Sequence, residues 1–160
     1  MGGGSILDQC HIMDLFHFLF GNFSSVYAFN TKISNLEIQA DDIAELIVHF
    51  DNKIIGSIHT DIFGRRHNKT FEIKGTDGNI TWDFYNKKVI LYESNTKKET
   101  IFDNFDNDFN KCYIDELNTF ISACKGDNVI YPNLEVGIDT MKLIISAEKS
   151  HNSNKLEKIQ

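Results

Sequence analysis

Cysteines are few and long apolar runs are missing in this 160-residue chain, and each scarcity argues against a class of protein. The three cysteines are odd in number and lack the Cys-x-x-Cys spacing of metal and redox motifs, so we expect reduced thiols and a cytoplasmic protein. No apolar run reaches the roughly 20 residues that a membrane span needs. The N-terminus is glycine-rich where a secretory signal would be basic and then apolar, so no signal peptide is predicted.

Concentrated positive charge is missing as well. The net charge is −7, and the longest basic runs are Arg65-Arg66-His67, Lys87-Lys88 and Lys97-Lys98. A nucleic-acid surface needs a concentrated basic stripe, so nucleic-acid binding is not expected. The chain also lacks a Gly-x-Gly-x-x-Gly motif after a strand, a P-loop and a βαβ pattern. No dinucleotide-binding fold is therefore predicted within these residues.

What the chain does contain is the patterning of one globular α+β domain. Apolar residues make up 41% of it, including thirteen Phe, which is enough for a buried core. Alternating apolar and polar residues predict successive strands joined by tight turns, and hence a mostly antiparallel open sheet with helices on one face. These strands are expected at residues 25–34, 44–50, 54–62, 70–74, 79–84 and 88–93, with a weaker one at 100–102 and a solvated polar loop at 35–42.

Two helices are expected in the C-terminal part of the chain. One helix, at 108–125, begins at an aspartate that can cap it, and another is expected at 134–150. We expect the first helix to bury a stripe made of Phe109, Tyr113, Leu117, Phe120, Ile121 and Cys124. Residues 151–160 are polar, and we expect them to fray apart from a short apolar return near Leu156 or Ile159.

The beginning of the chain combines a glycine run with an amphipathic helix. Gly2-Gly3-Gly4 indicates a sharp turn or a close approach of the backbone, since glycines cost chain entropy and add no packing. A helix is predicted from Leu7 to Phe20, with a buried stripe that contains Ile12, Leu15, Phe16 and Leu19. Asp8 and His11 fall on the same face, one turn apart. The pattern therefore places a carboxylate and an imidazole on the side expected to be buried.

Spacing alone leaves two interpretations of this pair. In the structural one, Asp8 caps the helix or offsets its dipole, and His11 is a core histidine bonded to a backbone carbonyl. In the functional one, Asp8 holds His11 at the rim of a cleft, where the imidazole exchanges a proton with a substrate near neutral pH.

The same stretch resembles the start of the C-terminal domain of the Gfo/Idh/MocA family of NAD(P)-dependent oxidoreductases, the relatives of glucose–fructose oxidoreductase and inositol dehydrogenase. The family's glycine run, short apolar segment, Asp, His, Asp and Leu-Phe-Gly ending are present as Gly2-Gly3-Gly4, Ile6-Leu7, Asp8, His11, Asp14-Leu15 and Leu19-Phe20-Gly21. Many members place three residues between the Asp and the His, where this chain has Gln9 and Cys10. Segments at 50–58, 71–80, 113–117 and 132–150 are also similar to the family.

The resemblance implies that residues 1–160 are the substrate-binding and oligomerisation domain of an enzyme that oxidises a secondary hydroxyl of a sugar, polyol or sugar derivative. NAD or NADP would be bound mainly by an N-terminal Rossmann domain that these residues do not contain, so we expect them to be inactive alone. His11 is expected to take the hydroxyl proton as hydride leaves for the nicotinamide. Asp8 is expected to orient His11 or to bind a neighbouring hydroxyl.

Four further residues are candidates at the substrate site. Asp14 is interpreted chiefly as an acid that supports the site. Arg65, Arg66 and His67, in a loop between strands, could contact an anionic substituent such as a phosphate or carboxylate, although a solvated turn explains them equally well. Asp8, His11 and Asp14 could supply ligands to a metal, but hydride transfer of this type needs none, and no metal is predicted.

The second face of the sheet mixes isoleucines with polar residues, and in the resembling family this face packs subunits together, so a homodimer or larger homo-oligomer is expected. Its predicted members are Ile47, Ile55, Ile90, Glu45, His49, Ser57, His59 and Lys88. Two other function classes remain open. One is a non-catalytic ligand-binding or dimerisation module in which Asp8 and His11 are structural. The other is a stand-alone hydrolase or isomerase that uses the pair in a pocket of its own.

Overall fold

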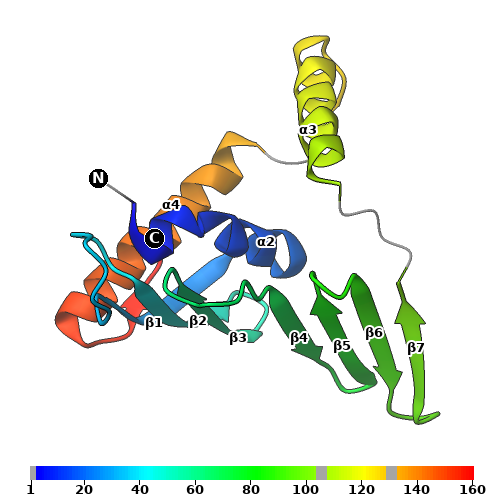
Figure 1. Cartoon of the computed structure of the whole chain (residues 1–160), viewed down its shortest axis with the longest axis horizontal. Coiled ribbons are helices and arrows are strands. Elements are labelled where there is room, and N and C mark those ends of the chain that lie inside the picture. The colour runs from blue at the N-terminus through cyan, green and yellow to red at the C-terminus, as the bar shows by residue number, and fades with distance from the viewer. Residues whose placement is uncertain (1–2, 104–107, 129–132) are drawn as a thin grey trace. The chain divides into compact units, whose positions relative to one another are not determined.

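The structure, a computed structural model, describes residues 3–103, 108–128 and 133–160. It divides into two compact units, one formed by the N-terminal part through Gly64 together with the C-terminal helix and tail, and one that begins at Arg65. Each unit contains a four-stranded antiparallel sheet (Figure 1). The predicted α+β class is confirmed, with two open sheets where the strand pattern suggested one. Gly2 and Pro132 of the family-like segments lie outside the described residues.

The first sheet has the strand order β3-β2-β1-β8. Its strands are β1 (Phe23–Thr31), β2 (Ile43–Phe50), β3 (Ile55–Asp61) and β8 (Glu157–Lys158). Val26 lies opposite Val48, and Leu46 lies opposite Ile58, and all four side chains are buried. Alternate residues of each strand therefore supply one face of the core, as the period-two pattern predicted.

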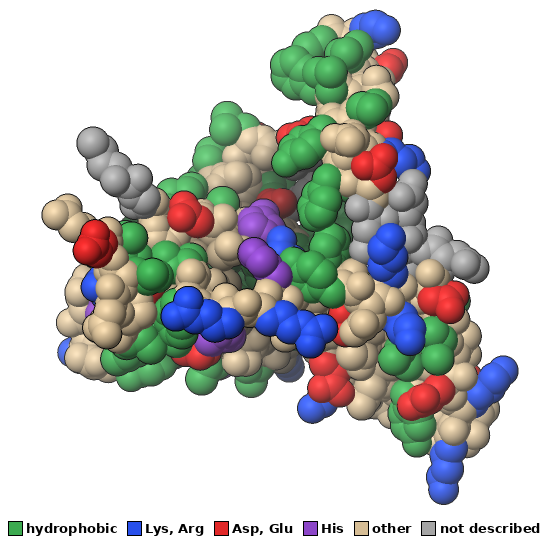
Figure 2. Space-filling model, viewed as in Figure 1, with side chains coloured by type: hydrophobic (Ala, Val, Ile, Leu, Met, Phe, Trp, Pro, Cys, Tyr) green, Lys and Arg blue, Asp and Glu red, His purple; other side chains and the backbone are tan. Residues whose placement is uncertain are grey.

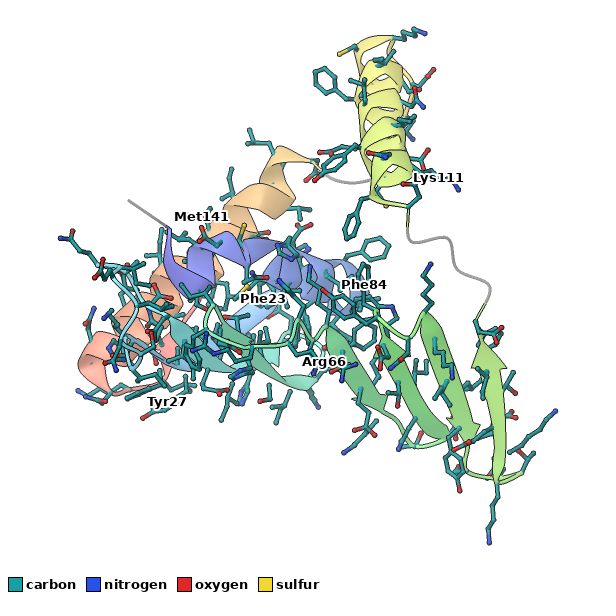
Figure 3. All side chains as sticks on the ribbon, in the orientation of Figure 1. Phe23, Tyr27, Arg66, Phe84, Lys111 and Met141 are labelled. Carbon is teal, nitrogen blue, oxygen red and sulfur yellow. The ribbon has the colours of Figure 1, made fainter. Side chains whose placement is uncertain are left out.

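Three helices belong to the same unit: α1 (Gly4–Asp8), α2 (Cys10–Phe20) and α4 (Leu134–Ser153). In Figure 1, α2 and α4 lie on the same side of strands β1 to β3. Figure 3 shows Phe23 of β1 beneath α2, and Met13 and Leu143 bring fully buried side chains from the two helices to this core. Among the described residues, no helix is long and apolar enough to cross a membrane.

The opposite face of the first sheet is not covered by any described element of this unit. Figure 3 shows Tyr27 pointing away from the helices. We call this surface the open face and define it by Tyr27, Glu45, Ile47, Ile55 and His59. Ile47 and Ile55 are 50% and 66% exposed, and Ile47 lies opposite Tyr27, which is 42% exposed. Ile90 and Lys88, predicted to share this face, belong to the second sheet instead, because strand pairing starts afresh at β4.

The second unit is a meander of four strands that pair in sequence order. They are β4 (Thr70–Lys74), β5 (Gly78–Asp83), β6 (Lys88–Glu93) and β7 (Lys98–Phe102). The rings of Phe71 and Trp82 are paired across β4 and β5 with their centroids 5.1 Å apart, and Ile73 lies opposite Ile80. Hairpin signals in the sequence therefore located β4, β5 and β6, and β7 extends the weaker strand predicted at 100–102.

The second unit also contains α3 (Phe109–Cys124), which begins as predicted: the Asp108 carboxylate accepts a hydrogen bond from the backbone N–H of Asn110 at 3.0 Å. The predicted burial of its stripe was wrong, since no residue of α3 is buried and Tyr113 is 68% exposed. Apolar side chains gather along this helix in Figure 2. Helical spacing identifies an apolar stripe, but it does not say which element, if any, packs against it.

The C-terminal tail is ordered where the sequence predicted fraying. Helix α4 is capped by Asn154, which adopts a left-handed conformation, and the chain then returns to pair with β1 through β8. The hydroxyl of Ser150 accepts a hydrogen bond from the backbone N–H of Ala28 at 3.0 Å and donates one to the carbonyl of Lys155. These bonds tie the tail to the edge of β1. The predicted apolar return is present at Ile159, which packs against the core.

Candidate active site

The predicted pair, Asp8 and His11, lies at the junction of two helices. Asp8 is the last residue of α1 and His11 is the second residue of α2, while Gln9 between them leaves the helical conformation with φ −102° and ψ 19°. Both side chains are exposed. The expectation of one continuous helix with this pair on its buried face was therefore wrong. The break falls in the segment that is one residue shorter than in many members of the resembling family.

The buried stripe of α2 is rotated from the predicted one. Met13 is fully buried, and Phe16 and Phe20 pack against the core, whereas Leu19 is 39% exposed. Because α2 is apolar around most of its circumference, helical spacing fits more than one stripe. Ring packing selects among them, since the rings of Phe20 and Phe50 have their centroids 5.4 Å apart. This rotation leaves Asp8 and His11 at the surface.

A residue that the sequence analysis missed, Asp41, holds the start of α1. Its carboxylate accepts a hydrogen bond from the backbone N–H of Ile6 at 2.9 Å, and its backbone carbonyl accepts one from the N–H of Ser5 at 2.9 Å. Two of the N–H groups that every helix start leaves unpaired are thus satisfied by a loop 35 residues further on. The hydroxyl of Ser5 donates to Thr60 at 2.9 Å and ties the same helix to β3.

The glycine run permits this close approach. Gly4 has φ +79°, in the left-handed region, and a Cβ added there would overlap the Asp41 carboxylate. A Cβ at Gly3 would lie 2.6 Å from Oδ1 of Asp8, so this carboxylate folds back over the backbone at the start of α1. The expected reason for the glycines, a backbone that must be approached closely, is confirmed at both positions.

The predicted solvated loop at 35–42 ends in a buried carboxylate. Asp42 is fully buried and accepts hydrogen bonds from the backbone N–H groups of Ile33 and Ser34 at 2.8 Å and from the Ser34 hydroxyl at 2.5 Å. Burial by itself raises the pKa of Asp42, but these hydrogen bonds outweigh it and the net pKa is lowered. An aspartate directly before an apolar strand was the signal available in the sequence.

Asp14 and a second histidine lie further along α2. Asp14 is half-buried. His17, which the sequence analysis did not single out, lies 3.8 Å from Asp139 of α4, and its ring meets Phe23 edge-on with centroids 5.6 Å apart. Asp139 in turn contacts Lys142 at 3.1 Å. These contacts attach α2 to α4 and so fix the helix that carries His11.

Arg65, Arg66 and His67 are exposed and belong to the second unit, whereas Asp8, His11 and Asp14 belong to the first. Two residues of this basic loop, Arg66 and His67, interact with the turn after β5. Hydrogen bonds from Asn86 lower the pKa of Asp83, and the positive charge of Arg66 adds to that effect. The ring of His67 lies 6.4 Å from that of Tyr85.

The helix junction thus presents an exposed carboxylate, that of Asp8, and an exposed imidazole, that of His11. An imidazole in this position can accept or donate a proton near neutral pH once a ligand reaches it. Among the described residues, no group of three His, Cys, Asp or Glu side chains is arranged to hold a metal ion.

Comparison with known proteins places this geometry in a family. Residues 1–160 match the model of the Gfo/Idh/MocA oxidoreductase family, C-terminal alpha/beta domain. An NAD-binding oxidoreductase from Klebsiella pneumoniae has 19% sequence identity and a TM-score of 0.80, with 94% of this chain aligned to 49% of that one. Levoglucosan dehydrogenase in complex with NADH and levoglucosan has 18% identity and a TM-score of 0.81, with 94% of this chain aligned to 48% of the enzyme.

An oxidoreductase from Agrobacterium radiobacter, in complex with NAD⁺, L-tartaric acid and magnesium, aligns at 15% identity with a TM-score of 0.76, over 94% of this chain and 47% of that one. No curated protein matches the sequence. The chain spans about half the length of the solved structures that it matches. With a family match along its whole length and the family's fold in both units, the chain belongs to the Gfo/Idh/MocA oxidoreductases and represents their C-terminal α/β domain.

Proposed function

We propose that this domain forms the substrate-binding half of an NAD(P)-dependent enzyme that oxidises a secondary hydroxyl of a sugar, polyol or sugar derivative. The observation that carries the proposal is the exposed pair at the α1–α2 junction, Asp8 and His11, on an element held in place by Asp41. Levoglucosan dehydrogenase, one of the similar structures, has been seen with NADH and levoglucosan and with NADH and L-sorbose. Those ligands support the choice of a hydroxylated substrate.

A nicotinamide cofactor, bound mainly by a preceding Rossmann domain, would supply the hydride acceptor. The residues present are compatible with this arrangement, since the side chains of Asp8 and His11 are exposed. In the oxidation, His11 takes the hydroxyl proton while the carbon-bound hydrogen leaves with its electron pair. Asp8 binds a neighbouring hydroxyl or holds the imidazole in orientation. These residues alone would be inactive, because they lack the group that accepts the hydride.

Three further residues have supporting roles in the proposal. Arg66, with Arg65 and His67 beside it, would contact an anionic substituent of the substrate, and Asp14 would support the α2 helix behind His11. A domain of this kind would also assemble through its open face, with a second copy covering Ile47 and Ile55. The enzyme would then be a homodimer or a larger homo-oligomer.

A non-catalytic ligand-binding or dimerisation module is the second candidate. The contact that favours it is the carboxylate of Asp8 folded over Gly3, since a side chain engaged in its own helix turn can be structural.

One assay separates the two candidates. The full-length protein, incubated with NAD⁺ or NADP⁺ and a panel of levoglucosan, L-sorbose and myo-inositol, should reduce the nicotinamide with at least one of them. Absence of reduction across a broad panel of polyols and sugars would favour the non-catalytic module.

A further inference from the structure

Helix α2 carries three polar side chains, His11, Asp14 and His17, in an otherwise apolar sequence. They are spaced three residues apart, so each is turned by about 60° around the helix from the one before. His11 is exposed and Asp14 is half-buried, whereas the side chain of His17 is only 11% exposed. The polar strip of α2 therefore begins at the surface and ends in the contact with α4.

The imidazole of His17 lies between a ring of β1 and a carboxylate of α4. Its ring meets Phe23 edge-on, and its Nε2 lies 3.8 Å from Oδ2 of Asp139, which is the distance of an ion pair and longer than a hydrogen bond. Lys142 contacts the other oxygen of that carboxylate, Oδ1, at 3.1 Å. Nε2 is buried and has no hydrogen-bond partner in the described structure, so Oδ2 of Asp139 is a nearby acceptor for an N–H at this nitrogen.

Helix α4 gives this contact a fixed frame. Leu143 of α4 is fully buried, and the hydroxyl of Ser150 accepts a hydrogen bond from the N–H of Ala28 in β1. Apolar packing alone does not select one rotation of α2, because burial is non-directional and this helix is apolar around most of its circumference. A buried imidazole does select, since another rotation would bury it without the Asp139 carboxylate or move it out of the interface.

The rotation of α2 decides where His11 points. His11 precedes His17 by six residues, which is about 9 Å along one helix. A rotation of about 20° would move a side-chain end that lies about 5–6 Å from the helix axis by about 2 Å. We propose that His17, held opposite Asp139, is a positioning residue that sets the rotation of α2 and with it the direction of the His11 imidazole. Its effect on turnover rests on the proposed function, in which His11 takes the substrate proton.

Two substitutions of His17 separate its ring from its nitrogen. His17→Phe keeps the edge-on contact with Phe23 but removes Nε2, whereas His17→Gln keeps a nitrogen donor within reach of Asp139 but removes the ring. The full-length protein is labelled with ¹³C at Cε1 of histidine, and the NMR signal of His11 is identified by its loss in His11→Ala. This signal should shift or split in His17→Phe and in Asp139→Asn, and it should keep the wild-type position in His17→Gln.

Stability and turnover together separate positioning from a merely structural role. The urea midpoint of His17→Phe should equal or exceed that of wild type, because an apolar ring replaces a buried unpaired nitrogen while Asp139 keeps its contact with Lys142. Its kcat for nicotinamide reduction should nevertheless fall about tenfold to 100-fold, the scale for a misplaced reacting group. The substrate is whichever of levoglucosan, L-sorbose and myo-inositol is turned over, and His17→Gln should restore the rate.

Asp51→Asn makes the same change as Asp139→Asn at an exposed aspartate, and this control should leave the His11 signal, the urea midpoint and kcat unchanged. A His11 signal that stays in place in both His17→Phe and Asp139→Asn would overturn the proposal. A wild-type kcat of His17→Phe, in an enzyme that His11→Ala inactivates, would overturn it as well. If the signal moves but His11→Ala retains the wild-type kcat, the positioning role stands and the proposed function fails.

Discussion

The carboxylate of Asp41 accepts a hydrogen bond from the backbone N–H of Ile6 at 2.9 Å and thereby fixes the helix that ends in Asp8. The contact is possible because Gly4, which lies against the Asp41 carboxylate, has no side chain. Its φ is +79°. The glycine run at the start of the chain is thus part of the geometry of the candidate site. The glycines are required for this backbone contact whether or not they bind a ligand.

Gly4→Ala should destabilise the domain by about 2 kcal/mol, because it places a Cβ in the left-handed region and against a carboxylate. Gly137→Ala is the matched control: this glycine lies in α4, and a Cβ there meets no atom within 4 Å. The control should stabilise the domain by roughly 0.5–1 kcal/mol, since alanine is the better helix former. Urea denaturation measures both changes, and equal effects of the same sign would contradict the assigned contact.

Asp42→Asn should lower stability at neutral pH, because the buried carboxylate accepts three hydrogen bonds that favour its charged form. The pKa of Asp42 is lowered in the folded state, so its contribution is present above the unfolded value of about 3.9 and is lost as pH falls through the folded pKa. The stability difference between wild type and variant should therefore shrink on acidification. Asp51→Asn, the same substitution at an exposed aspartate, is the control and should leave stability at neutral pH close to that of wild type.

His59 lies between two carboxylates on the first sheet, with Nδ1 2.5 Å from Glu45 and Nε2 3.2 Å from Asp61. The hydrogen bond to Glu45 is the main cause that raises the pKa of His59, and Asp61 adds to it. The resulting stabilisation is present below the unfolded value of about 6.5 and is lost as pH rises through the folded pKa. An NMR titration of the ring should give a pKa above that value in wild type, and Glu45→Gln should bring it down; an unchanged pKa would contradict the pairing.

Ile47→Glu should weaken self-association of the full-length protein at least tenfold, because it places a charge at the centre of the proposed interface on the open face. Ile33→Glu makes the same change at a side chain that is 61% exposed in the loop after β1, and it should have little effect. Sedimentation equilibrium distinguishes the two. If both variants associate like wild type, the open face does not carry the assembly.

Strands β2 and β3 were predictable from the sequence because each one alternates buried and exposed residues against a single covered face. Packing partners were not predictable in the same way. The stripe of α3 has the spacing of a buried face and is exposed, and the stripe of α2 fits its helix in more than one rotation. Asp41 and Asp42 looked like a solvated charge run, yet one caps a helix across the fold and the other is buried by backbone donors, and neither relation is local in sequence.

The same limit applies to Asp8 and His11 in the candidate site, because their surroundings were not predictable from spacing along the chain. The family resemblance proposed both residues as site residues; family membership is confirmed, and their roles stay a prediction. Helical spacing gave the wrong surroundings for them, because it assumed an unbroken helix through Gln9, whose backbone is not helical. The sequence showed that one residue fewer separates Asp8 and His11 than in many family members. It did not show that the helix breaks between them.

The role of His11 as proton acceptor is the central claim, and the turnover of His11→Ala in the full-length protein tests it most directly. With saturating nicotinamide and a substrate identified in the panel, kcat should fall by roughly 10²–10⁴-fold, the usual contribution of a positioned acid–base group. Lys98→Ala, at an exposed residue of β7 outside the helix junction, is the control and should keep its turnover. A His11→Ala enzyme whose kcat equals that of wild type would contradict the account.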